Sequence, residues 1–218
     1  MQGFDLEMIR LEPGAHPGSP DGCLMEWVAL MSGLPKTDRP GCINQLVTSV
    51  AIHLNDTLDD RARQRLKGFI PRILRARRGP DDGLIGVRLA IWAAASIAGA
   101  APDGLRSLHD ETLAAAAGRL DGSVSEAECR VQASAAAEAG AKAKNSALYV
   151  AADAAHAACA DDPTPAAANA VAGALHWVVR HGDPLVWFGG LLDAHAVAAA
   201  AVTGAPLDIT RDAVCSPV

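Results

Sequence analysis

Aromatic residues are scarce in this chain. One tyrosine, three phenylalanines and four tryptophans make up 4% of 218 residues, although half of all residues are hydrophobic. Alanine, leucine, valine and isoleucine therefore supply most of the apolar surface. Alanine has the highest helix propensity and lets helix backbones approach closely, but each alanine buries little area, so a core of this kind needs many helix–helix contacts. This composition predicts an all-α protein.

The sequence also lacks three features: an excess of positive charge, a recognisable leader segment and a long uninterrupted apolar run. The formal net charge is −6, whereas nucleic-acid binders carry a basic face that displaces counterions from phosphates, so we expect no nucleic-acid partner. The first residues contain neither a basic segment nor an apolar run. The most apolar region, residues 84–101, is interrupted by Gly86 and Arg88, so we expect no membrane span. Five cysteines without a leader favour reduced thiols and a cytoplasmic protein.

One basic stretch stands out against the acidic background. Its cations are Arg61, Arg63, Arg65, Lys67, Arg72, Arg75, Arg77 and Arg78. We interpret it as a solvated helical face whose charge complements a helix C-terminus. The alternative is that it binds an acidic partner or a phosphorylated ligand.

Proline and glycine divide the chain into an arm, a helical domain and a tail. Residues 1–22 form an N-terminal arm that is irregular or contains a short strand, and residues 204–218 form a loose tail. The helical domain covers residues 23–203, with a subdomain break near residues 79–83. We predict a single-core bundle of about seven to nine helices.

Caps and periodicity indicate where these helices begin and end. Asp21 is expected to cap the first, Thr37 or Asp38 the second, and Ser125 with Glu128 forms a capping-box spacing. The expected helices are 23–32, one ending near Asp56, 59–78 with a kink at Pro71, 84–99, 105–120, 123–160 with a bend at Gly140, 166–181 and 184–203.

The segment from Leu11 to Arg78 resembles an uncharacterised group of alanine-rich helical proteins from actinobacteria and their phages. The residues that carry the resemblance are Leu11-Glu-Pro-Gly-Ala-His16, Cys23-Leu-Met-Glu26, Asp38-Arg-Pro-Gly-Cys42, Leu54-Asn-Asp56, Arg63-Gln-Arg-Leu66 and Ile70-Pro-Arg72. The resemblance covers the first third of the chain and implies a helical pattern without an activity. It departs at Thr37-Asp38-Arg39, where the pattern has serine, aspartate and histidine, and this weakens a catalytic interpretation.

The most distinctive chemistry lies at the expected first helix pair. Cys23 and Glu26 are three residues apart and so share a helix face. Cys42 is expected in the first turn of the second helix, where the helix dipole would stabilise a thiolate. One hypothesis is a catalytic set of Glu26, Asp38 and Cys42, with Cys23 as a metal ligand. The alternative, which we favour, is buried structural thiols with Glu26 holding a helix end.

A second group could bind a metal ion. Asp153, His156 and Cys159 recur every three residues on one expected helix, and His195 lies on another. Di-metal bundles place carboxylate and histidine at this spacing, although they use several glutamates that are absent here. A polar stripe on an alanine helix is the favoured alternative. Asn55, Asp56, Asp59 and Asp60 are similarly read as a helix stop and a new N-cap rather than as a cation site.

No phosphate loop, dinucleotide fingerprint, zincin helix or nucleophile elbow occurs in the sequence, and no cofactor is indicated. The expected function is a cytoplasmic interaction or accessory protein that self-associates through helical surfaces or binds a protein partner. The alternative is an enzyme, or a binder of a small molecule or metal, with its site at Glu26, Asp38 and Cys42. Whether the chain is an enzyme is left open at this point.

Overall fold

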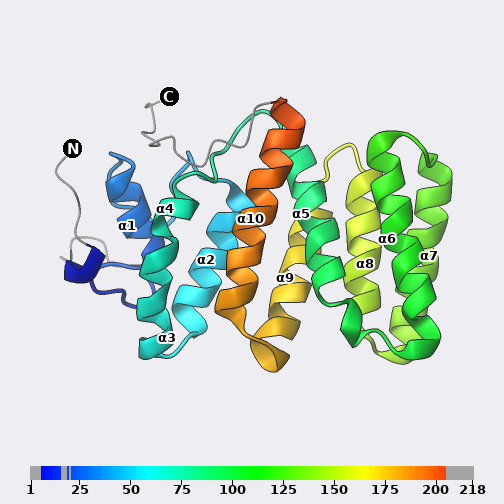
Figure 1. Cartoon of the computed structure of the whole chain (residues 1–218), viewed down its shortest axis with the longest axis horizontal. Coiled ribbons are helices and arrows are strands. Elements are labelled where there is room, and N and C mark those ends of the chain that lie inside the picture. The colour runs from blue at the N-terminus through cyan, green and yellow to red at the C-terminus, as the bar shows by residue number, and fades with distance from the viewer. Residues whose placement is uncertain (1–5, 16–18, 20, 205–218) are drawn as a thin grey trace. The chain divides into compact units, whose positions relative to one another are not determined.

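A computed structural model describes residues 6–15, 19 and 21–204 (Figure 1). These residues are 74% helical and contain nine α-helices of six residues or more, together with the four-residue α4 and short 3-10 turns. The all-α prediction is confirmed. The chain divides into two compact units, one with the described residues up to Gly79 and one from Pro80 onward. The predicted tail lies, from residue 205, outside the described residues.

The first unit contains an arm and short helices. They are η1 (Leu6–Met8), α1 (Leu24–Met31), α2 (Gln45–Thr57), α3 (Asp60–Arg65), η2 (Leu66–Phe69) and α4 (Ile70–Ile73). In place of the short strand considered for the arm, the described part has η1 and a single bridge between Leu11 and Gly22. Its core is aliphatic, and the fully buried side chains include Leu11, Leu24, Met25, Ile43, Leu54, Leu66, Ile70 and Ile73.

The predicted starts of the first two helices are wrong. The N-cap of α1 is Cys23 rather than Asp21, and α2 begins at Gln45 rather than close to Thr37 or Asp38. The N-cap of α2 is Asn44, whose Oδ1 accepts hydrogen bonds from the next turn of backbone.

A short extended pairing explains the late start of α2 and the early end of α4. The Asn44 N–H donates to the Ala76 carbonyl at 2.8 Å, and the Arg78 N–H donates to the Cys42 carbonyl at 2.9 Å. Residues that pair in this way cannot also form a helical turn. Residues 74–78 are therefore not helical, although a helix was expected to reach Arg78.

The second unit consists of longer helices. They are α5 (Asp82–Ser96), η3 (Ala98–Ala100), η4 (Asp103–Leu105), α6 (Arg106–Asp121), α7 (Glu126–Ala143), α8 (Ser146–Cys159), α9 (Thr164–His181) and α10 (Pro184–Thr203). Helix α8 is central, since it packs against α5, α6, α7 and α9, while α10 packs mainly on α5. Figure 1 shows α6, α7 and α8 side by side.

The single stretch expected over residues 123–160 is two helices. Lys144 adopts a left-handed conformation with φ of 50° and ends α7, and the Asn145 side chain caps α8 by accepting from the Leu148 N–H at 3.2 Å. Gly140 lies at the close contact between the two helices, because a Cβ there would be 3.3 Å from the Tyr149 nitrogen. The capping box of Ser125 at the start of α7 is confirmed.

One described helix, α10, is long and apolar enough to cross a membrane by length and composition alone. Buried core helices pass the same test. Phe188 and Leu191 in α10 are fully buried, while Val186 and Val197 are exposed. Residues 184–203 were expected to form a helix, and no membrane span was expected there.

Candidate functional site

Glu26, the first predicted catalytic residue, is a helix cap. Its Oε2 accepts a hydrogen bond from the Cys23 N–H at 2.8 Å, and its side chain is buried. Burial, together with the charge of the nearby Glu26 carboxylate, raises the pKa of the Cys23 thiol to about 11. Cys23 is thus a protonated thiol at neutral pH. This geometry matches the structural alternative, in which Glu26 holds a helix end.

Cys42 is not in the first turn of a helix. It lies in a turn before Asn44, so the predicted stabilisation of a thiolate by the dipole of α2 is wrong. Cys42 is also disulfide-bonded in the structure, which leaves no thiolate there. Asp38 lies half-buried in the same loop.

The predicted metal ligands do not come together. Within the described ranges, no group of three His, Cys, Asp or Glu side chains is placed to hold a metal ion. Asp153 and His156 lie at the partly exposed edge of α8, whereas His195 is buried on α10. Burial lowers the pKa of His195 and raises that of Asp153. Cys23 belongs to the other unit.

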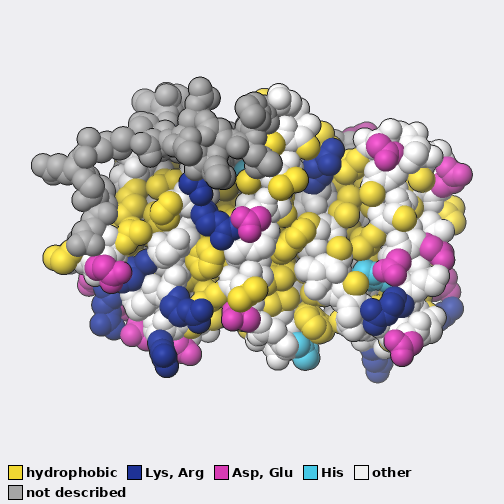
Figure 2. Space-filling model, viewed as in Figure 1, with side chains coloured by type: hydrophobic (Ala, Val, Ile, Leu, Met, Phe, Trp, Pro, Cys, Tyr) yellow, Lys and Arg dark blue, Asp and Glu magenta, His cyan; other side chains and the backbone are white. Residues whose placement is uncertain are grey.

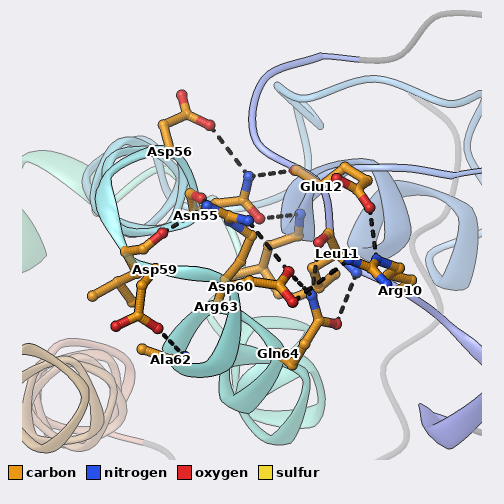
Figure 3. Close-up of polar contacts among 12 residues, drawn as sticks. Arg10, Leu11, Glu12, Asn55, Asp56, Asp59, Asp60, Ala62, Arg63 and Gln64 are labelled. Carbon is orange, nitrogen blue, oxygen red and sulfur yellow. Dashed lines mark hydrogen bonds and ion pairs between the residues drawn. The ribbon is translucent and has the colours of Figure 1, made fainter.

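The aspartates around the end of α2 have structural partners (Figure 3). Asp59 caps α3 by accepting from the Ala62 N–H at 2.8 Å, which is the N-cap role that the sequence favoured. Asp56 accepts from the Gly14 N–H at 2.8 Å, and Asp60 forms ion pairs with two arginines. These carboxylates are therefore used in holding the arm and the start of α3.

Two amide side chains bind the backbone of the arm (Figure 3). Asn55, fully buried, accepts from the Leu24 N–H at 3.1 Å and donates to the Glu12 carbonyl at 2.8 Å. Gln64 accepts from the Leu11 N–H at 3.0 Å and donates to the Leu11 carbonyl at 2.8 Å. A side-chain amide can accept from a backbone N–H and donate to a backbone carbonyl at the same time, so the arm is fixed by specific polar contacts.

A cavity of about 270 Å³ lies in the first unit, beside the predicted catalytic loop. We call it the Arg39 pocket. It is formed by the loop before α2, the first turns of α2 and the extended residues that pair with that loop. The described residues that line it are Arg39, Pro40, Gly41, Ile43, Gln45, Thr48, Ser49 and Arg78. Glu26, Asp38 and Cys42 are not among them.

The charged side chains that line the Arg39 pocket are both cationic. Arg39 and Arg78 line it, and no carboxylate does among its described residues. Thr48 is 5% exposed, and its Oγ1 is a buried atom with no hydrogen-bond partner in the described structure. The start of α2 at Gln45 adds the partial positive charge of a helix N-terminus.

Two residues of this pocket stood out in the sequence, but nothing there indicated that they lie close together. Arg78 was in the basic stretch for which a phosphorylated ligand was considered, and Arg39 was the departure from the pattern of the resembling group. Thr48 carried no signal, because a threonine within a helix is ordinary. Comparisons of the chain with protein-family models, with curated proteins and with solved structures give no match.

Proposed function

We propose that this protein binds a small phosphorylated ligand in the Arg39 pocket. The observation that carries the proposal is the lining itself, which has two arginines and no carboxylate among the described lining residues.

The chemistry of the lining suits a phosphate group. A planar guanidinium donates two parallel hydrogen bonds to phosphate oxygens, and such charge-assisted bonds are about twice as strong as neutral ones. The Ser49 hydroxyl adds a neutral donor. The dipole of α2 adds partial positive charge, although Asn44 already accepts from two of the N–H groups in its first turn. A carboxylate ligand shares part of this chemistry but offers fewer oxygens.

The volume restricts the size of the ligand. Pockets for drug-sized molecules usually measure about 300–1,000 Å³, and the Arg39 pocket, at about 270 Å³, lies just below that range. Inorganic phosphate or a small phosphate monoester fits such a space, whereas a dinucleotide does not. The acidic chain as a whole would repel an anion, so the local arginines must supply the attraction.

Calorimetric titration at constant ionic strength tests the proposal, with inorganic phosphate as the probe and acetate as the comparison anion. We expect saturable phosphate binding that is weakened about tenfold or more by Arg39→Ala, since one charged hydrogen bond contributes about 1.5–3 kcal/mol. Arg61→Ala, which removes an exposed arginine that does not line the pocket, is the matched control.

Two results would refute this function. One is the lack of saturable phosphate binding by the full chain. The other is an equal loss of phosphate affinity in Arg39→Ala and Arg61→Ala, which would mean that the affinity depends only on the net charge of the chain. Binding of acetate as tight as that of phosphate would reassign the ligand to a carboxylate.

Self-association through helical surfaces stays a second proposal. Val131, Val186 and Val197 in the second unit are more than half exposed. On the face drawn in Figure 2, apolar side chains over α5 to α9 lie among polar and charged ones. Sedimentation velocity over a range of concentrations is the test, and a monomer throughout would contradict this proposal.

A further inference from the structure

Two cysteines meet where α7 begins and α8 ends. Cys129 is in the first turn of α7, and Cys159 is the last residue of α8. Both are free thiols, 0% and 6% exposed, and both belong to one buried cluster with Ala133 and Ala155. In the sequence, Cys159 was noted only as part of the possible metal-binding group with Asp153, and nothing there connected it with Cys129.

Reciprocal hydrogen bonds place the two thiols against each other. The Cys129 Sγ donates to the Ala155 carbonyl at 3.5 Å, and the Cys159 Sγ donates to the Glu126 carbonyl at 3.9 Å. Ala155 is one helical turn before Cys159, and Glu126 is just under one turn before Cys129. Each thiol therefore contacts the turn of helix that carries the other cysteine.

The surroundings hold this contact in place. Ala133 and Ala155 are fully buried, and side chains this small let α7 and α8 approach closely. Arg130 also ties the two helix ends together, since its Nη2 donates to the Cys159 carbonyl at 2.9 Å while its Nε pairs with Glu126 at 2.8 Å. The pair thus lies between two elements that already pack without a covalent bond.

We infer that Cys129 and Cys159 are a thiol–disulfide site, which an oxidised low-molecular-weight disulfide converts into a covalent link between α7 and α8. In the first step the Cys159 sulfur, as thiolate, attacks the oxidant, forms a mixed disulfide and releases one thiolate. In the second, the Cys129 sulfur attacks the Cys159 sulfur and releases the other. Two protein thiols lose two electrons and two protons, and one oxidant disulfide becomes two thiols.

Exposure decides the order and the speed of these steps. Cys159 is the more accessible sulfur and lies at a helix end, where local opening costs least. Burial, together with the neighbouring Cys159 thiol, raises the pKa of Cys129 to about 12. Thiolate is therefore scarce at neutral pH, and the site reacts slowly, as a sensor of sustained rather than brief oxidation.

The experiment uses the full chain, incubated with oxidised glutathione at pH 8, then denatured, alkylated with iodoacetamide and mapped by peptide mass spectrometry. We expect a peptide pair joined through Cys129 and Cys159, removed again by reductant. Cys129→Ala should leave a glutathione adduct on Cys159 and no link. Cys23→Ala removes another free buried thiol, in the other unit, and should leave the link unchanged.

Three outcomes would overturn the inference, and each can be seen in the unmutated chain. The first is that both thiols stay fully alkylatable after prolonged oxidation. The second is that Cys159 stops at the glutathione adduct while Cys129 remains free. The third is that the link forms only in denaturant, which would show that the native packing does not bring the sulfurs together.

Discussion

Gly190 on α10 is the position where a single added carbon has the clearest consequence. A Cβ built there would lie 2.7 Å from Cζ2 and 3.3 Å from Cη2 of Trp92 on α5. The Trp92 ring faces Trp187 on α10, with centroids 5.3 Å apart. Trp187 is itself fixed, because its Nε1 donates to the Ser96 Oγ at 2.8 Å. The Trp92 ring therefore cannot move away without disturbing a second tryptophan.

Gly190→Ala has two opposing effects on the free energy of unfolding. Carbon atoms pack best about 3.5–4.0 Å apart, so the ring of Trp92 must shift by about 1 Å. Overpacking of this kind costs about 1–3 kcal/mol, and a rigid ring belongs at the upper end. Alanine in place of glycine within a helix gains about 1 kcal/mol. We expect a net loss of about 2 kcal/mol, which lowers the melting temperature by about 4–8 °C.

Thermal unfolding followed by circular dichroism measures this loss, and tryptophan emission reports the shift of the ring pair. Gly68→Ala is the control, since nothing lies within 4 Å of the Cβ it would add. Trp92→Leu combined with Gly190→Ala should recover part of the stability, because the double change removes the clash. A Gly190→Ala chain as stable as the parent would refute this reasoning.

Three further changes test other parts of the structure. Glu26→Ala should lower the free energy of unfolding by about 1–2 kcal/mol at pH 7, because it removes the cap of the Cys23 N–H; Glu26→Gln, which keeps an acceptor, should cost less, and equal losses would contradict the capping role. Burial lowers the pKa of His195, so below pH 6.5 the unfolded chain binds a proton that the native chain does not, and the free energy of unfolding decreases as the pH decreases. His195→Gln should remove that part of the stability loss between pH 7 and pH 5. An unchanged dependence of the unfolding free energy on pH would contradict this role of His195. Asn55→Leu should release the arm and speed trypsin cleavage after Arg10, whereas an unchanged rate would show that Asn55 is dispensable.

Local chemistry alone was enough to predict several elements. Helix α10 runs from Pro184 to Thr203 as expected, because Asp183 caps it and a proline is favoured in the first turn. The Asp59 cap and the Ser125 box are read from a few adjacent residues in the same way. In each case the groups that make the bond are close in sequence.

Predictions failed where distant residues compete with local ones. Pro40 has the features of a first helical turn, but pairing with residues 76–78 keeps its surroundings extended. The end of α7 at Lys144 had no glycine or proline to mark it, and lysine is an unusual residue in a left-handed conformation. The packing of α7 on α8 favours a break between the two helices that the helix propensities of these residues do not predict.

Composition and periodicity, then, were sufficient for the all-α class, since alanine content and apolar spacing act within single helices. The two proposed sites required the tertiary structure. Arg39 and Arg78 line one pocket because an extended pairing brings distant residues together. Cys129 and Cys159 lie in one buried cluster because α7 packs on α8. Glu26, the residue that the sequence marked most strongly, proved to be a cap, because its buried carboxylate accepts from the Cys23 N–H at the start of its own helix. Side chains that look alike in sequence acquire different roles through burial and through the neighbours that folding supplies.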